Sequence, residues 1–211
     1  MEAVWSRFLP VYQHINRWME QEMDSRVEYL RADFGIYKEF DPESRIFKPE
    51  LGGGSLLDLG FYPVWLALHA YDSEPETIHA EGRLLENGTD DLVTMTLNFP
   101  GGGKADLMCA NRMATPTKAE IYGNGYRLEI DTEFHCPYRA SLTRGDHIST
   151  YNCKFKPHGY QFETDEVNRC IRDGLQESPA MPLERSRQIM RTLDRIREQI
   201  GLKYPEKCES V

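Results

Sequence analysis

Long hydrophobic runs are missing from this sequence of 211 residues. No stretch of 18 consecutive apolar residues occurs, so no transmembrane helix and no membrane partner are expected. The N-terminus also lacks the basic-then-apolar plan of a signal peptide. Basic residues are few, because 25 Lys and Arg stand against 34 Asp and Glu and leave a net charge of −9. Since nucleic-acid binding needs clustered Lys and Arg, this balance disfavours a nucleic-acid partner.

Closely spaced cysteines are absent as well. The five cysteines are scattered and odd in number, and they are Cys109, Cys136, Cys153, Cys170 and Cys208. No two of them have the spacing of a zinc site or a redox pair, so reduced thiols and a cytoplasmic location are expected. One region does gather candidate metal ligands, namely His135, Cys136, His147, Cys153 and His158. None shows the short ligand spacing of known sites, so no metal is expected.

The composition and the residue patterns predict a folded α+β domain. An apolar content of 40% supports a packed core. Helical spacing begins at Pro10 and returns after residue 160, with a longer helix from Pro182 to Gly201. Alternating patterns predict strands at 26–34, 78–85, 91–99, 105–110, 118–122, 126–130, 140–143 and 147–151. Short turns join most of these strands, so we expect a predominantly antiparallel open sheet with helices packed on one face. The predicted domain is 1–204, followed by a polar tail at 205–211.

One stretch, Gly52 to Pro63, predicts an interior helix with two polar side chains. The residues after Ser55 are apolar on nearly every side, which is typical of a buried helix, and Pro63 should kink it. Asp58 and Tyr62 are four residues apart and therefore share a face. An acid beside a phenol is a plausible proton-transfer pair. A structural alternative stays open, in which Ser55 and Asp58 form a capping box and Tyr62 is a bonded core residue.

Three separated segments resemble the Gfo/Idh/MocA oxidoreductases. They are Glu2-Ala3-Val4-Trp5-Ser6-Arg7-Phe8-Leu9-Pro10, then Arg31-Ala32-Asp33-Phe34-Gly35, and then Gly52 to Pro63. The C-terminal part, from Glu163 through Pro182-Leu183-Glu184 to Gly201, continues the likeness. Tyr62, where many relatives have His, favours the branch of dimeric dihydrodiol dehydrogenase and NADP-dependent xylose dehydrogenase.

The resemblance implies one of two domains. Members of the family pair a Rossmann domain, which binds NAD(P), with a C-terminal α+β domain that faces the substrate. This sequence looks like the second domain alone, because it has no strand and G-x-G-x-x-G turn with a downstream acidic residue. It also lacks the Glu-Lys-Pro segment whose lysine completes the family's catalytic group. We therefore expect NADP or NAD to bind only with a Rossmann domain supplied from elsewhere, in a longer parent chain or a separate polypeptide.

The resemblance also assigns roles to single residues. By position, Tyr62 matches the family's proton donor and Asp58 its orienting acid. Trp5 and Phe34 resemble aromatic residues that line the substrate pocket, and Arg7 falls in the same first motif. Three further residues lie where relatives contact the cofactor or support its site, and they are Arg45, Tyr160 and Glu163.

Two functions follow as expectations. The first is the substrate-side domain of an NAD(P)-dependent oxidoreductase that moves hydride to or from a sugar, polyol or trans-dihydrodiol, with Tyr62 as proton donor or acceptor. The second is a catalytically inactive, truncated relative that acts as an oligomerisation or binding module. In either case a homo-oligomer through the sheet is expected. Because the lysine is missing, the chain alone is expected to be inactive.

Overall fold

A computed structural model of the chain describes residues 1–23, 26–155 and 159–205. Within them, eight strands form one open sheet in the order β2-β3-β4-β1-β5-β6-β7-β8. Their bounds are β1 Val27–Gly35, β2 Thr77–Leu84, β3 Asp90–Asn98, β4 Lys104–Ala110, β5 Ala119–Gly123, β6 Tyr126–Ile130, β7 Arg139–Arg144 and β8 His147–Asn152. The predicted tail after Pro205, with Cys208, lies outside the described residues, as does His158.

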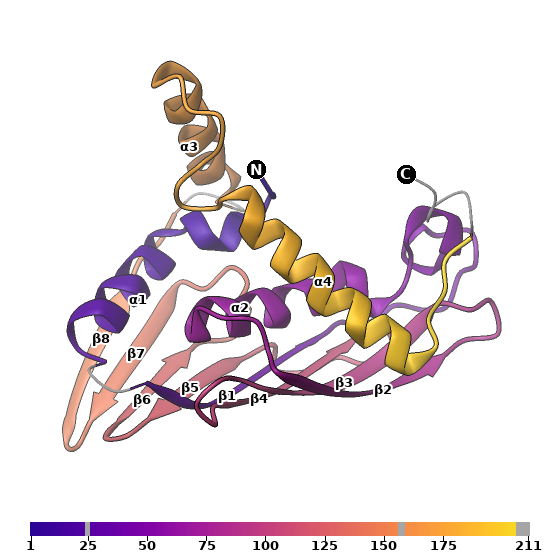
Figure 1. Cartoon of the computed structure of the whole chain (residues 1–211), viewed down its shortest axis with the longest axis horizontal. Coiled ribbons are helices and arrows are strands. Elements are labelled where there is room, and N and C mark those ends of the chain that lie inside the picture. Colours follow the sequence, from indigo (N-terminus) through magenta and orange to yellow (C-terminus); the bar gives the residue numbers. More distant parts are fainter. Residues whose placement is uncertain (24–25, 156–158, 206–211) are drawn as a thin grey trace.

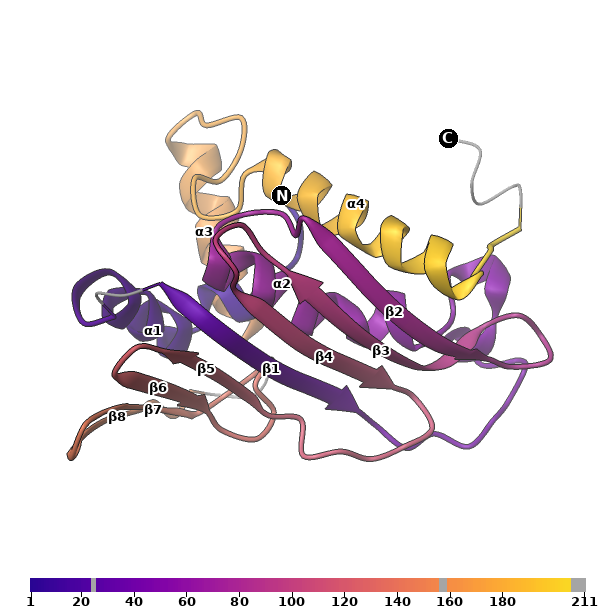
Figure 2. The same ribbon diagram turned by 60° about the horizontal axis from the view of Figure 1, so that its bottom comes forward.

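The sheet is antiparallel at every pairing except one. Strand β1 lies between β4, to which it runs parallel, and β5, to which it runs antiparallel. The meander β2-β3-β4 therefore extends the sheet on one side of β1, and the hairpins β5 to β8 extend it on the other (Figure 2). The predicted open and mostly antiparallel α+β sheet is confirmed. The parallel pair arises because the chain enters the middle of the sheet first and returns to both sides of it.

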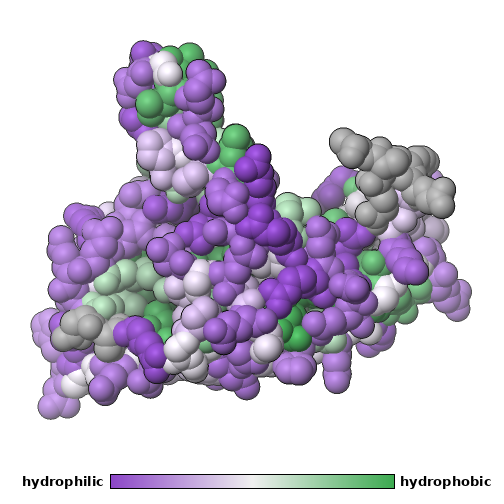
Figure 3. Space-filling model, in the orientation of Figure 1, coloured by the Kyte–Doolittle hydropathy of each residue, from purple (hydrophilic) through white to green (hydrophobic). Residues whose placement is uncertain are grey.

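The helices gather on one face of the sheet, as predicted. Helices α1 (Pro10–Gln21), α2 (Phe61–Tyr71) and α4 (Leu183–Ile200) cover this face, and the opposite face is bare (Figures 1 and 2). Helix α3 (Tyr160–Arg172) instead projects from the body and contacts the 3₁₀ turn η1 (Trp5–Phe8) at its base. Its surface is largely hydrophilic with a few apolar groups (Figure 3).

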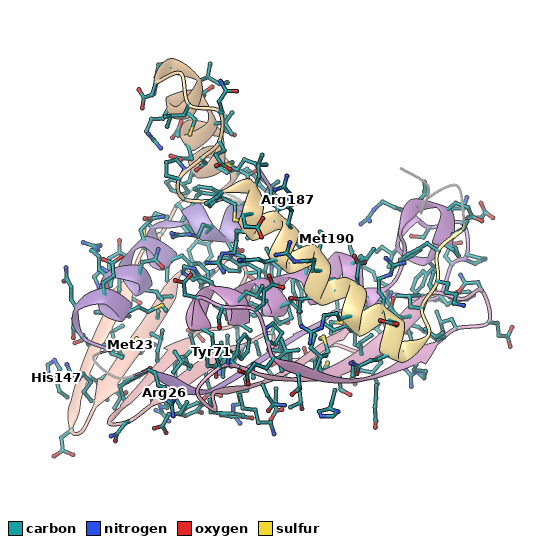
Figure 4. The ribbon with its side chains drawn as sticks, viewed as in Figure 1. Met23, Arg26, Tyr71, His147, Arg187 and Met190 are labelled. Atoms are coloured by element: carbon teal, nitrogen blue, oxygen red, sulfur yellow. The ribbon has the colours of Figure 1, made fainter. Side chains whose placement is uncertain are left out.

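Helix α2 is the centre of the core. Seven of its eleven residues are buried, and Trp65, Leu66 and Leu68 have at most 1% of their surface exposed. Tyr71, at its end (Figure 4), stacks on Phe99, the residue that follows β3, with ring centroids 3.9 Å apart. The segment Pro49–Tyr71 is long and apolar enough to cross a membrane by length and composition alone. However, 67% of its most apolar stretch of 18 residues is buried inside the protein. The interior position predicted for this helix is confirmed.

The start of this helix differs from the expected capping box. A π-helical turn, η4 (Leu56–Gly60), precedes α2. The Ser55 hydroxyl does not cap it but donates to Asp90 Oδ2 at 2.6 Å. The same carboxylate oxygen accepts the Leu56 backbone N–H at 2.7 Å, so the cap comes from β3. Asp58 bonds Arg45 instead. The capping-box alternative is therefore wrong, because a residue 35 positions away satisfies the helix terminus.

Candidate active site

Five aromatic rings from five segments meet beside the start of α2. The Trp5 indole N–H donates to the Tyr62 hydroxyl at 2.8 Å. Phe34, near the end of β1, lies 5.6 Å from the Tyr62 ring and stacks on His135 at 4.4 Å, both between centroids. Tyr160, at the base of α3, lies 4.7 Å from Trp5. The structure thus brings together Tyr62, Trp5, Phe34 and Tyr160, which the sequence had placed in one site.

We call these five residues the ring cluster (Trp5, Phe34, Tyr62, His135 and Tyr160). Tyr62 is half-buried and brings a hydroxyl group to this cluster. Burial raises the pKa of Tyr62 above its usual 10.0, and the negative charges of Asp58 and Glu163 act in the same direction. The hydrogen bond from Trp5 opposes this shift only in part. The phenol is therefore protonated at neutral pH. Because Trp5 donates to its oxygen, the Tyr62 hydrogen is free to donate elsewhere.

Asp58 lies near Tyr62 but does not bond it. Its carboxylate pairs with Arg45, with Nη2 and Oδ1 2.8 Å apart, and 27% of the Asp58 side chain is exposed. No hydrogen bond joins Asp58 to Tyr62 among the described residues. The acid therefore acts on the phenol through its charge, and Arg45 offsets part of that charge.

Arg7 is a predicted site residue that the structure directs away from the ring cluster. Its Nε donates to the Ala180 carbonyl at 3.3 Å. The guanidinium lines a cavity together with His69 and Arg185, and Tyr62 is not among the residues of that cavity. Trp5 and Arg7 thus leave the same short turn toward different sites. The position of Arg7 in the first motif gave no signal of this.

His135 belongs to the ring cluster although the sequence suggested it only as a candidate metal ligand. Burial lowers the pKa of His135 to about 4, so the imidazole is neutral, and its Nδ1 is buried without a hydrogen-bond partner. It lies between β6 and β7, where no periodic pattern marks a buried residue. Among the described residues, no group of three or more His, Cys, Asp or Glu side chains could hold a metal.

Glu163 completes the polar surroundings of Tyr62. It lies in the first turn of α3, three residues after Tyr160. Its Oε2 is buried without a partner in the described part of the chain, and burial raises the pKa of Glu163. A carboxylate in this position suits a hydroxyl or amide donor from a ligand. Its place in the site was expected only from the family resemblance.

The ring cluster suits one end of a nicotinamide cofactor and not the other. Its aromatic faces and the free Glu163 oxygen fit a flat ring with an amide. The glycine trio before η4 is no phosphate cradle, because the carboxylate of Asp90 already occupies that helix terminus. The trio Gly101–Gly103 lies in the turn between β3 and β4. Neither glycine trio is therefore a site for the phosphates of a dinucleotide.

Sequence comparison gives curated relatives that are themselves longer than this chain. The chain is 32% identical over 212 residues to the trans-1,2-dihydrobenzene-1,2-diol dehydrogenase of Xenopus tropicalis, covering 97% of this chain and 64% of the relative. It is 33% identical to the enzyme of the same name from Danio rerio, covering 99% of this chain and 64% of the relative. The chain therefore spans a little under two thirds of the length of these relatives.

Solved structures share the fold. The 3-ketoreductase KijD10 of Actinomadura kijaniata, solved with NADP, matches with a TM-score of 0.80 at 20% identity, over 95% of this chain and 62% of its own. The aldose-aldose oxidoreductase of Caulobacter crescentus matches with a TM-score of 0.78 at 20% identity, over 93% of this chain and 60% of its own. Residues 12–129 match the GFO/IDH/MocA C-terminal domain. The chain belongs to the GFO/IDH/MocA family, and its sheet with the helices on one face is the C-terminal domain of that family.

Proposed function

We propose that this chain is the substrate-side domain of an NAD(P)-dependent oxidoreductase that transfers hydride to or from a sugar, polyol or trans-dihydrodiol. The observation that carries the proposal is the protonated, half-buried Tyr62, held by Trp5 inside the ring cluster. The names of the relatives, which are diol dehydrogenases, support the diol among these substrates. NADP in a structural neighbour supports the choice of cofactor.

Tyr62 has a defined task in this chemistry. A bound nicotinamide supplies or accepts the hydride. The Tyr62 hydroxyl gives its proton to the carbonyl oxygen in reduction, and the Tyr62 phenolate takes the alcohol proton in oxidation. Its raised pKa favours the first direction, because the protonated phenol is already an acid at neutral pH. Oxidation needs the phenolate, which a cation from a second domain would favour.

The other members of the ring cluster fit the binding of such a substrate. Phe34 and Trp5 are 6% and 7% exposed and form an apolar wall beside the hydroxyl of Tyr62. A diol or sugar ring placed against this wall presents its C–H face to the aromatic rings and its hydroxyls to the polar groups. Glu163 Oε2, which has no partner among the described residues, could accept either such a hydroxyl or the amide of a nicotinamide, but not both.

NADPH binding tests whether the chain needs a second domain. We expect the chain alone to bind NADPH more weakly than about 1 mM, since neither glycine trio offers a phosphate cradle beside the ring cluster. Addition of a separately expressed nicotinamide-binding domain of the same family should restore both binding and reduction of a diketone or ketosugar. Fluorescence titration of NADPH and its consumption at 340 nm measure the two. Tight binding by the chain alone would reject this requirement, and no activity in any combination would favour the inactive module.

The homo-oligomer expected under either function has an observation of its own. The bare face of the sheet holds a cavity of about 730 Å³, and its lining includes Tyr29, Thr94, Thr96 and Asp106. We propose that a second copy of the chain covers this face. Analytical ultracentrifugation at micromolar concentration should then give a mass of twice 24.5 kDa. Thr94→Arg, in the middle of this face, should shift the chain toward the monomer, whereas Thr132→Arg, in a loop, should not. A single-chain mass for the unchanged protein contradicts the proposal.

A further inference from the structure

A second cavity lies on the helical side of the molecule, between α1, α2 and the start of α4 (Figure 1). Its volume is about 510 Å³, within the range of small-molecule sites. The polar groups of its lining are two arginines, three acids and three uncharged side chains, and they come from Arg7, Arg185, Glu20, Asp72, Glu184, Asn16, His69 and Gln188. Trp65, Met19 and Met181 supply apolar surface. No member of the ring cluster lines it, so it is a separate site from the one around Tyr62.

Arg7 is a partly buried cation that has no ion pair among the described residues. The one hydrogen bond of its guanidinium in this part of the chain is the contact of 3.3 Å with the Ala180 carbonyl, and its Nη1 is buried with no partner there. Burial and the nearby charge of Arg185 both lower the pKa of Arg7. Buried guanidinium groups in proteins are as a rule paired with an anion. Glu20 and Glu166 lie near enough for their charges to raise the pKa of Arg7, but neither forms an ion pair with it among the described residues.

The other charged groups of the cavity are already paired, with one exception. Asp72 pairs with Arg185 at 2.5 Å, and Glu184 pairs with Arg191 at 2.7 Å. Glu20, on α1, is exposed and has no ion pair among the described residues, although its charge raises the pKa of Arg7. Within the described part of the chain, Glu20 is therefore the one acid of the lining without an ion pair, and it competes with an external anion for Arg7.

Neutral polar groups line this cavity together with the two arginines and the apolar residues. His69 is uncharged, because burial lowers its pKa to about 3, and its Nε2 bonds Asn16 Oδ1 at 2.7 Å. The His69 ring stacks on Trp65. Gln188 has a buried carbonyl oxygen without a partner. A ligand in this cavity would meet cationic, uncharged polar and aromatic surfaces together.

We propose that this cavity binds a small organic oxyanion, with its carboxylate or phosphate at Arg7 and Arg185 and an apolar body against Trp65 and Met181. Guanidinium groups bind carboxylate and phosphate through the same paired N–H donors. The anion supplies the partner that Arg7 lacks. This site does not depend on the function proposed for Tyr62.

Calorimetric titration of the whole chain with benzoate tests the proposal. Benzamide, which has the same shape without the charge, separates anion recognition from an apolar hollow, and phenyl phosphate separates carboxylate from phosphate preference. We expect benzoate or phenyl phosphate to bind at least about tenfold more tightly than benzamide, because benzamide cannot form the charged pair with a guanidinium group. Equal binding of benzoate, phenyl phosphate and benzamide would overturn the proposal. The proposal would also fail if none of the three binds at a ligand concentration 10-fold above about 1 mM.

Three variants give effects of different sign. Arg7→Met should weaken benzoate binding at least about tenfold, and Glu20→Gln should strengthen it, because it removes the competing carboxylate. Arg187→Met removes the same charge from the outward side of α4 and should leave binding within about twofold (Figure 4). Should Arg7→Met not fold, Glu20→Gln still decides, since weaker or unchanged binding in that variant contradicts a site at Arg7.

Discussion

Replacement of Gly54 by Ala is expected to destabilise the domain by roughly 3–5 kcal/mol, a large part of the stability of an ordinary domain. Gly54 has a φ of +125°, a backbone conformation that L side chains rarely adopt. A Cβ there would lie 2.0 Å from Asp90 Oδ1. That carboxylate cannot move away without giving up its bonds to Ser55 and to the Leu56 N–H at the start of the interior helix.

Gly52→Ala is the matched control for this prediction. Gly52 also has a positive φ, of +68°, but a Cβ there would meet nothing nearer than Leu57 Cδ1 at 4.0 Å. Its cost should be about 1–2 kcal/mol, from backbone strain alone. Urea unfolding followed by circular dichroism measures both variants. Equal losses would show that the contact with Asp90 contributes nothing and that only the backbone conformation matters.

The same region shows what the sequence could and could not predict. The apolar residues from Leu56 to Leu68 predicted a buried helix, because a helix buried on all sides is apolar on all its faces. The cap of that helix could not be predicted, since Asp90 reaches it only after the sheet has formed. Local spacing favoured Ser55 and Asp58 as partners of each other. Each found a partner from another segment instead.

The site was predictable to the extent that its residues lie in recognisable motifs. Trp5, Phe34 and Tyr62 were placed together from their motifs, and the structure brings them together. Arg7 shares a motif with Trp5, but the turn that carries both sends the arginine toward α4. His135 lies in an irregular segment where neither helical nor alternating spacing applies, so its burial against Phe34 left no pattern. The pairing of β1 with β4 could not be predicted either, because spacing within each strand does not reveal a partner strand far away in the chain.

Replacement of Tyr62 by Phe should lower kcat for carbonyl reduction by about 10²–10⁴, the usual contribution of a positioned proton donor. The assay combines the chain with a nicotinamide-binding domain of the family. The variant keeps the ring that packs against Phe34 and loses only the hydroxyl that accepts the Trp5 N–H. Its stability should therefore change by only about 1 kcal/mol, the net worth of one hydrogen bond.

Tyr71→Phe is the control on the same helix. The Tyr71 hydroxyl donates to the Lys104 carbonyl at the sheet, so its loss should affect stability to a similar extent and leave kcat unchanged. A KM that rises for Tyr62→Phe with kcat intact would mean that the hydroxyl binds substrate without transferring a proton. Activity unchanged by Tyr62→Phe would remove this residue from the mechanism.

The pH dependence separates proton transfer from a purely structural role of Tyr62. Because burial raises the pKa of the phenol above 10.0, the acid form persists through neutral pH, and reduction should slow only when the pH rises through that pKa. Oxidation needs the phenolate, so its rate should rise with pH over the same range. In the Tyr62→Phe variant, neither the fall in the reduction rate nor the rise in the oxidation rate over this pH range should remain. Profiles of the two directions that fail to mirror each other would assign the proton to another group, and Glu163 is then the residue to test, since its buried oxygen has no other partner among the described residues.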